Sequence, residues 1–269
     1  MRLRIIGCTG SMSGPDSPAS CYLLQAHGPD ERTGRERTWN LVLDMGPGSF
    51  GELWRYIEPS NLDAVIFSHC HADHMGDVIS LHVYRRWGPG AYCDPMVLAG
   101  PACLPGRVRQ IDGVGEEESY STEFIFKELQ DAQSWSLGPF TVSAAQAWHS
   151  VPAFGVRISG PSGFSKGDTS GSRSTFFYTG DTDLCDSIVE GARGVDLLLS
   201  EAGFTEEDTV EGIHMDGSRA GTLAARAEVG RVILTHIQPW NNPEATRWQA
   251  QQVYSGDVEL ATTGMSVDF

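Results

Sequence analysis

The sequence predicts an α/β fold in which β-sheets carry helices on their outer faces. Short apolar stretches rich in β-branched residues recur along the chain, and most end at glycine, serine or a residue able to do chemistry, as buried strands do. Between the later stretches lie segments of helical length. Because strands and helices are mixed in this way, we expect sheets with helices packed against them.

The apolar stretches predict the strands in chain order. The early ones are joined by turn-rich loops, which favours antiparallel hairpins. The polar, glycine-rich stretches 27–38 and 159–174 separate neighbouring strands and are typical of surface hairpin loops. The predicted strands are LRIIGC (3–8), CYLLQA (21–26), WNLVLDMG (39–46), DAVIFSH (63–69), PMVLAG (95–100), FTVSAAQA (140–147), FGVRIS (154–159), STFFYTG (174–180), VDLLLSEAG (195–203) and RVILTHI (231–237).

Four segments predict helices, and they cover residues 75–87, 184–192, 216–229 and 243–254. The last begins at Pro243 behind Asn242, which suits a capping residue followed by proline in the first helical position. No repeat or linker interrupts the chain, so we expect a single domain over residues 1–269.

Composition limits the classes of function. A chain of 269 residues with 40% hydrophobic and 20% charged residues is typical of a globular enzyme. The formal charge of -16 repels nucleic acid in the absence of a local basic strip. No apolar run approaches the roughly 20 residues of a membrane helix, so no membrane association is expected. Six cysteines without a C-x-x-C pair fit reduced thiols, and the expected location is cytoplasmic.

A dense cluster of possible metal ligands follows the strand predicted at 63–69. The segment FSHCHADHMGD contains His69, His71, Asp73 and His74. Imidazole and carboxylate groups are the ligands that zinc and similar ions prefer, and packing alone does not explain four of them so close together. His69 and His71 can face one way in an extended segment, while Asp73 and His74 follow a turn. This spacing predicts two metal ions.

Further ligands are expected at the ends of other strands. His149 follows FTVSAAQAW, Asp181 follows STFFYTG, and His236 follows RVILT. Each residue alone could be a surface residue, a helix cap or a packed core histidine. Three separate strands that end in this way favour a shared site.

The ordered set of seven residues resembles the dinuclear hydrolases of the metallo-β-lactamase fold. The resemblance runs from end to end of the chain and implies a four-layer αβ/βα sandwich of two mixed sheets, with the site along one edge. It implies two divalent ions, with zinc as the first expectation and Mn²⁺ or Fe²⁺ also compatible with these ligands. By this resemblance, His69, His71 and His149 hold the first ion, Asp73, His74 and His236 hold the second, and Asp181 bridges them.

Other segments resemble the ribonuclease Z group within this fold. They are LLLSEAGF (197–204), GIHMD (212–216) and VILTHIQPW (232–240). In that group a glutamate and a histidine, which match Glu201 and His214, form a pair beside the metals. A carboxylate that favours a protonated histidine suits the protonation of a departing alkoxide, so Glu201 and His214 are predicted catalytic residues. The alternatives are an exposed carboxylate and a surface histidine. Asp73 is expected to orient or deprotonate the bridging water as well.

The closest likeness is to the ribonuclease-Z-like, atypical cyclic-AMP phosphodiesterases. It covers GCTGSMSGPDSPASCYLL (7–24), the HADH cluster, GDTDLCD (180–186) and LTHIQPW. It implies a phosphodiesterase that uses a metal-bridging hydroxide on 3′,5′-cyclic AMP or a related cyclic nucleotide. The 7–24 segment could bring backbone N–H groups to an anion or could be an ordinary hairpin loop.

The alternative functions are tRNA 3′ processing, another hydrolysis reaction of this fold, and a non-catalytic binding module. The tRNA elbow is bound in ribonuclease Z by a long arm between the segments that match His149 and Asp181, where this chain has only the short loop 159–174. A small phosphodiester is therefore preferred over tRNA as the partner, and relatives of this kind are often homodimers. His27 and His82 receive no predicted role.

Overall fold

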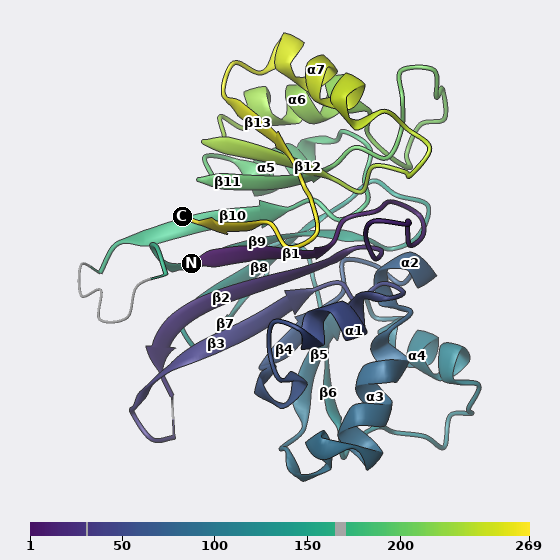
Figure 1. Cartoon of the computed structure of the whole chain (residues 1–269), viewed down its shortest axis with the longest axis vertical. Helices are drawn as coiled ribbons and strands as arrows, with labels where there is room; N and C mark the ends of the chain where they lie inside the picture. The colour runs from purple at the N-terminus through teal and green to yellow at the C-terminus, as the bar shows by residue number, and fades with distance from the viewer. Residues whose placement is uncertain (31, 165–170) are drawn as a thin grey trace.

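Two mixed β-sheets of seven strands each form the centre of the described part of the protein. The computed structural model describes residues 1–30, 32–164 and 171–269. Figure 1 shows one group of helices beside the first sheet at the bottom of the view and another beside the second sheet at the top. This arrangement confirms the predicted α/β sandwich.

The first sheet contains strands from both ends of the described chain. Its order is β14 (Ser266–Asp268), β1 (Arg2–Gly7), β2 (Cys21–Pro29), β3 (Glu36–Leu43), β4 (Ala64–Ile66), β5 (Met96–Gly100) and β6 (Phe124–Glu128). The second sheet has the order β13 (Asp257–Leu260), β12 (Arg231–Thr235), β11 (Leu197–Glu201), β10 (Arg173–Tyr178), β9 (Phe154–Pro161), β8 (Phe140–Gln146) and β7 (Ser134–Leu137).

The helices belong to one sheet or the other. Those beside the first sheet are α1 (Ser49–Trp54), α2 (Ala72–Met75), α3 (Val78–Trp87) and α4 (Leu104–Asp112), with short 3₁₀ turns η1 (Pro59–Asn61) and η2 (Pro89–Tyr92). Those beside the second sheet are α5 (Asp186–Ala192), α6 (Gly217–Arg226) and α7 (Pro243–Val253). Asn242 caps α7 as predicted, because its side chain accepts hydrogen bonds from the backbone N–H groups of Glu244 and Ala245.

The nearly continuous apolar runs follow from burial of both faces of the strands. In β11, Leu197 and Leu199 lie in the core between the two sheets, and Leu198 lies in the core beneath the helices. Successive side chains of a strand point to opposite faces, so a strand in a middle layer needs apolar residues at every position. The composition of the strands thus produces a layered fold of helices, sheet, sheet and helices.

All ten predicted strands are present, with shifted ends. The strands β2, β3, β9 and β10 extend into the stretches 27–38 and 159–174 that were predicted as loops. Residue 31 of the first stretch and residues 165–170 of the second lie outside the described residues. The helix predicted at 75–87 is wrong at its start: α2 ends at Met75, and α3 begins at Val78.

The parallel strands in each sheet end at the same edge of that sheet. β3, β4 and β5 are mutually parallel, as are β10, β11 and β12. β8 runs in the direction of β10, because both are antiparallel to β9. The segments that follow parallel strands meet at the same edge of a sheet, which is where side chains can converge without breaking the hydrogen-bonded ladder.

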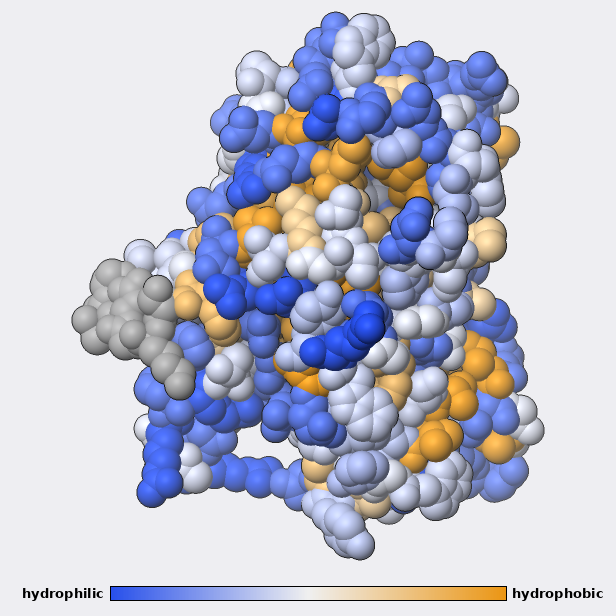
Figure 2. Space-filling view, in the orientation of Figure 1, coloured by the Kyte–Doolittle hydropathy of each residue, from blue (hydrophilic) through white to orange (hydrophobic). Residues whose placement is uncertain are grey.

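The surface of the protein is mainly hydrophilic on the face shown in Figure 2. Figure 2 shows a face on which hydrophilic residues predominate and hydrophobic residues lie in separate groups. No helix in the described part of the chain has the length and apolar character needed to cross a membrane.

Gly46 is required by close packing against α2, the short helix that carries the predicted ligands Asp73 and His74. A Cβ atom at Gly46 would lie 1.9 Å from the carbonyl oxygen of Asp73 and 2.7 Å from Cβ of Ala19. We expect Gly46→Ala to lower the free energy of unfolding by about 1–3 kcal/mol, as overpacking does. Denaturant unfolding of the metal-free protein measures this change.

The control is Gly51→Ala in α1, where an added Cβ meets nothing within 4 Å. Alanine in a helix is favoured over glycine by roughly 0.5–1 kcal/mol, so this variant should be as stable as the parent or more stable. Equal stability of the two variants would contradict the proposed clash.

Candidate dimetal centre

The predicted site residues lie together at the edge where the parallel strands end. His69, His71, Asp73 and His74 follow β4, and the other members follow or end β8, β10, β11 and β12. The structure thus brings all nine predicted site residues into one region. These residues are His69, His71, Asp73, His74, His149, Asp181, Glu201, His214 and His236.

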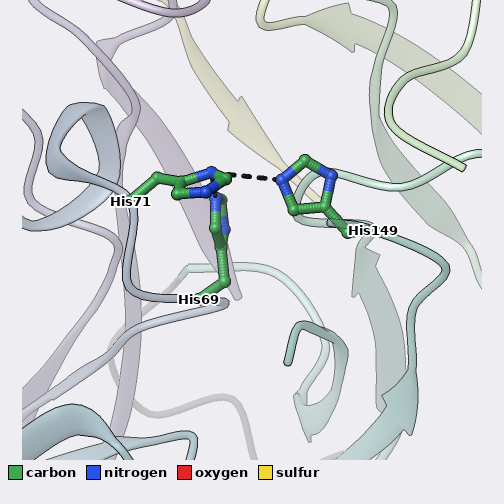
Figure 3. A group of neighbouring side chains, drawn as sticks. All are labelled: His69, His71 and His149. Atoms are coloured by element: carbon green, nitrogen blue, oxygen red, sulfur yellow. Dashed lines mark hydrogen bonds between the residues drawn. The ribbon is translucent and has the colours of Figure 1, made fainter. Parts of the chain in front are cut away.

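The first group consists of three histidines whose ring nitrogens converge. Nε2 of His69 lies 3.0 Å from Nδ1 of His71, and that atom lies 3.1 Å from Nε2 of His149. Figure 3 shows the three imidazoles turned toward one another, with His149 approaching from a different segment. Nitrogens that bind one zinc ion at about 2.0–2.1 Å lie roughly 3.3 Å apart in tetrahedral geometry, so this spacing is close to that of a zinc site.

The backbone selects the tautomer of His149. Its Nδ1–H donates to the carbonyl oxygen of Ile213 at 2.8 Å, which leaves the lone pair of Nε2 for the group. Burial lowers the pKa of His149 to about 4, and burial also lowers the pKa of His69 well below its usual value. Both rings are therefore neutral near pH 7, which is the form that binds metal.

The second group combines two carboxylates with two histidines. Nε2 of His74 lies 3.2 Å from Oδ2 of Asp73 and 3.1 Å from Oδ1 of Asp181. Nδ1 of His236 also lies 3.1 Å from Oδ1 of Asp181. His74, Asp181 and His236 are buried, with at most 2% of each exposed.

Asp181 faces both groups. Its Oδ1 belongs to the second group, whereas its Oδ2 lies 3.8 Å from Nε2 of His69 in the first. One carboxylate that offers one oxygen to each group has the geometry of a bridging ligand.

Unpaired buried atoms show that a cation fits this place. Nε2 of His74, Oδ1 of Asp181 and Nδ1 of His236 are inaccessible to solvent and, among the described residues, form no hydrogen bond despite lying close to one another. Leaving such atoms unpaired is costly, and a cation among them would satisfy all three. The chemistry of the donors suits zinc, manganese or iron.

Asp44 is a buried carboxylate beside His74 that was not among the predicted site residues. It is fully buried, and its Oδ2 lies 2.7 Å from Nδ1 of His74. The same carboxylate accepts hydrogen bonds from the backbone N–H and hydroxyl of Ser68 and from the hydroxyl of Tyr178. Asp44 thereby turns Nε2 of His74 toward the second group. It directly follows the apolar run of β3, the same signal that identified Asp181 and His236.

We expect Asp44→Asn to weaken metal binding by about 10–100-fold, the usual effect of losing a carboxylate behind a histidine ligand. Competition with a chelator of known affinity measures this change. Asp30→Asn is the matched control, because Asp30 follows β2, its carboxylate accepts hydrogen bonds from the backbone N–H groups of Arg32 and Thr33 and pairs with Arg37, and these partners lie outside the two ligand groups. Equal metal affinity in the two variants would show that Asp44 does not position His74.

His214 lies between the two groups and is held by Glu201. Its Nδ1 lies 3.1 Å from Oε1 of Glu201, and its ring centroid lies 5.5 Å from that of His149 and 5.2 Å from that of His236. Burial opposes a positive charge on His214, but Glu201 and Asp181 outweigh it and raise the pKa of His214 to about 9. In the metal-free protein the imidazole is therefore protonated near pH 7.

Glu201 is saturated by backbone donors. Its Oε1 accepts from the N–H of Thr182 at 2.9 Å, and its Oε2 accepts from the N–H of Gly203 at 2.8 Å. Glu201, His214 and His236 could be regarded as a third metal group. Because the carboxylate oxygens already have these partners, Glu201 is better suited to orient His214 than to bind an ion.

Asp183 and Arg219 fix the loop that carries His214, and the sequence analysis missed both. Oδ2 of Asp183 accepts from the N–H of Gly212 at 2.9 Å, and its Oδ1 accepts from Nη1 of Arg219 at 2.8 Å. Arg219 also contacts Asp216, the residue that caps α6. Only the burial of Asp183, which a sequence does not show, separates it from an ordinary loop carboxylate.

The 7–24 segment contacts the second group through its backbone. The backbone nitrogen of Ser11 lies 3.0 Å from Nε2 of His236, and the N–H of His236 donates to the carbonyl oxygen of Cys8 at 3.0 Å. A Cβ atom at Gly10 would lie 2.1 Å from the carbonyl oxygen of His236, so this approach requires glycine. The segment thus holds a predicted ligand.

The two histidines without a predicted role lie elsewhere. His27 stacks on Phe164, and His82 is buried in α3 beside Tyr120 and Trp87. They are separate from the nine site residues.

A layered α/β sandwich with converging histidines and aspartates at its strand edge defines a metallo-hydrolase of the β-lactamase superfamily, and the chain belongs to this family. The family model described as "Beta-lactamase superfamily domain" matches residues 39–237. This membership implies divalent metal ions and hydrolytic chemistry.

The individual relatives cover nearly the whole chain. The uncharacterized protein Rv1339 of Mycobacterium tuberculosis (strain ATCC 25618 / H37Rv) is 37% identical over 262 residues, which cover 96% of this chain and 88% of the relative. The probable metallo-hydrolase YhfI of Bacillus subtilis is 28% identical and covers 98% of both chains. The crystal structure of YhfI matches with a TM-score of 0.82 and 26% identity, over 100% of this chain and 99% of YhfI. Ribonuclease Z of Myxococcus xanthus is 27% identical over 85% of this chain and 88% of the relative.

Proposed function

We propose that the protein is a dimetal phosphodiesterase that hydrolyses 3′,5′-cyclic AMP or a closely related cyclic nucleotide. The observation that carries this proposal is the Glu201–His214 pair beside two groups of metal-ligating side chains. Metal ions can activate water and neutralise the phosphate oxygens, whereas a poor alkoxide leaving group also needs a proton donor.

The reaction divides between the ions and the chain. Two divalent ions, when bound, supply Lewis acidity that neutralises charge on the phosphoryl oxygens and activates water. His214 supplies the proton for the leaving oxygen. Because Nδ1 of His214 is hydrogen-bonded to Glu201, Nε2 is the atom that donates this proton. Asp73 is placed to orient the attacking water and to accept its proton.

The proposed reaction forms one bond to phosphorus and breaks another. The oxygen of one water molecule forms a new bond to phosphorus, and the bond between phosphorus and the 3′ oxygen of the ribose breaks. One water proton passes toward Asp73, and the 3′ oxygen receives a proton from His214. The product is the 5′-monophosphate.

Electrostatics favour a small anionic substrate. Two divalent ions carry more positive charge than the carboxylates of Asp73 and Asp181 carry negative charge, so the loaded centre attracts a phosphodiester. The whole chain has a formal charge of -16, which repels a long polyanion. This contrast supports a cyclic nucleotide over tRNA, although the relationship to ribonuclease Z keeps tRNA 3′ processing as the second candidate.

The proposal includes the identity of the ions and the assembly. Zinc is the first choice of metal, with Mn²⁺ and Fe²⁺ as alternatives. A homodimer is the proposed oligomeric state, which analytical ultracentrifugation tests.

A substrate screen tests the function. Metal-free protein is loaded separately with Zn²⁺, Mn²⁺ or Fe²⁺ and incubated with cyclic AMP, other cyclic nucleotides, linear phosphodiesters and a precursor tRNA. We expect metal-dependent conversion of cyclic AMP to AMP and no cleavage of the precursor tRNA. Cyclic AMP left intact with every metal would refute the substrate assignment, and cleavage of the precursor at its 3′ end would establish the second candidate.

A further inference from the structure

Two cysteines from distant parts of the chain meet beside the first histidine group. Sγ of Cys70 lies 3.6 Å from Sγ of Cys103, and both are free thiols. Cys70 lies between His69 and His71 in the sequence, whereas Cys103 caps the start of α4. The distance corresponds to van der Waals contact between sulfur atoms, so no other side chain separates them.

The pair is accessible from solvent. Cys103 is exposed, while Cys70 is buried with 7% of its surface accessible. Both line a pocket of about 550 Å³ that also contains His71 and Arg107. A small oxidant can therefore reach Cys103 first, and Cys70 is the nearest thiol to complete the reaction.

The backbone of Cys70 is tied to the centre on both sides. Its neighbours are the predicted ligands His69 and His71, and its carbonyl oxygen accepts from Nε of Arg107 at 3.2 Å. Cys103 is tied as well, because the next residue, Leu104, is buried in the core beneath the first sheet. Rotation about the Cα–Cβ bond moves each sulfur, and any further approach of the two sulfurs displaces the backbone that carries them.

We propose that Cys70 and Cys103 form a redox-active pair whose oxidation to a disulfide displaces His71 and weakens the first metal group. A disulfide bond is about 2.05 Å long, so the sulfur atoms must approach by roughly 1.5 Å. Ligand constellations tolerate displacements of only about 0.5 Å. Because His71 directly follows Cys70, any part of this approach that the backbone of Cys70 takes up also displaces His71.

The oxidant is a hydroperoxide. The Cys103 thiolate attacks the peroxide oxygen, the O–O bond breaks, and the products are a sulfenic acid on Cys103 and an alcohol, or water from hydrogen peroxide. The Cys70 thiol then attacks the Cys103 sulfur, the S–O bond breaks, and water leaves as the disulfide forms. The two thiols lose two electrons, and the peroxide gains them. A thiol reductant reverses the change.

The test oxidises the metal-loaded protein with hydrogen peroxide. Three readouts follow the reaction: titration of free thiols, mass spectrometry of proteolytic peptides, and the rate of metal transfer to a chelator. We expect loss of the thiols of Cys70 and Cys103, a peptide pair crosslinked through them, and about 10-fold faster transfer of metal. Treatment with dithiothreitol should restore the thiols and the slow transfer. These readouts do not depend on the proposed substrate.

Cys103→Ser and Cys93→Ser are matched variants, and each is compared with its own reduced form. Cys93 is half-buried after η2 and lies outside the pocket. Cys103→Ser should abolish the crosslink and the peroxide-dependent metal transfer, whereas Cys93→Ser should behave as the parent does. The proposal is overturned if no crosslink forms, if Cys103→Ser loses metal as quickly as the parent, or if the crosslinked protein retains metal as the reduced protein does.

Discussion

His214→Ala is expected to lower kcat for cyclic AMP by about 10²–10⁴-fold, the range that general acid catalysis contributes. The metal content should stay at the parental level, because His214 belongs to neither predicted ligand group. Steady-state kinetics and elemental analysis of the same preparation measure the two quantities. Loss of metal together with activity would show that His214 is a ligand and not a proton donor.

A substrate with a better leaving group distinguishes a role of His214 as proton donor from a purely structural role. A p-nitrophenyl ester departs as a stable phenolate and needs little protonation, so the same variant should lose far less activity on bis(p-nitrophenyl) phosphate. His27→Ala is the control, since His27 stacks on Phe164 away from the centre. An equal loss on both substrates would contradict the role of His214 as the acid.

Asp181→Asn is expected to impair both metal binding and activity. The substitution keeps the shape of the side chain but removes the charge that faces both groups. We expect weaker binding of both ions and a loss of activity of about 10³-fold or more, since each ion supplies several kcal/mol of transition-state stabilisation. Elemental analysis after dialysis and kcat at saturating metal measure the two effects.

Asp186→Asn provides the matched control. Asp186 begins α5 a few residues later, with its side chain 90% exposed and paired with Arg226. This variant should bind metal and react as the parent does, because exposed ion pairs contribute little. Retention of both ions by Asp181→Asn would remove the assignment of Asp181 as the bridging residue.

The sequence indicated the candidate metal ligands more clearly than the residues that orient those ligands. His69, Asp181 and His236 follow apolar runs, and the chemistry of their side chains is visible in the printed sequence. Asp44 gives the same signal, yet it has no neighbouring ligand-type residue to draw attention to it. Its role depends on a 2.7 Å contact with His74 that only folding creates. The sequence predicts which residues lie at the ends of strands, but it does not predict which side chains from different strands will be in contact.

The sequence likewise predicted the buried strands but missed the strands at the edges of the sheets. The ten predicted strands are buried and apolar, so their composition identifies them. The missed strands β6, β7, β13 and β14 lie toward the edges of the sheets and contain exposed polar positions. The early start predicted for α3 fails because Gly76 and Asp77 separate it from α2. Apolar periodicity does not reveal such a break.

The contact between Ser11 and His236 sets an order of events during biosynthesis. The second group needs His236, and His236 is oriented by a loop that the ribosome releases more than two hundred residues earlier. The first three histidines of the centre are synthesised well before this point. A nascent chain can therefore contain all three histidines of the first group, which is complete at His149, while the second group still lacks Asp181 and His236. Complete metal loading becomes one of the last steps in the maturation of the protein.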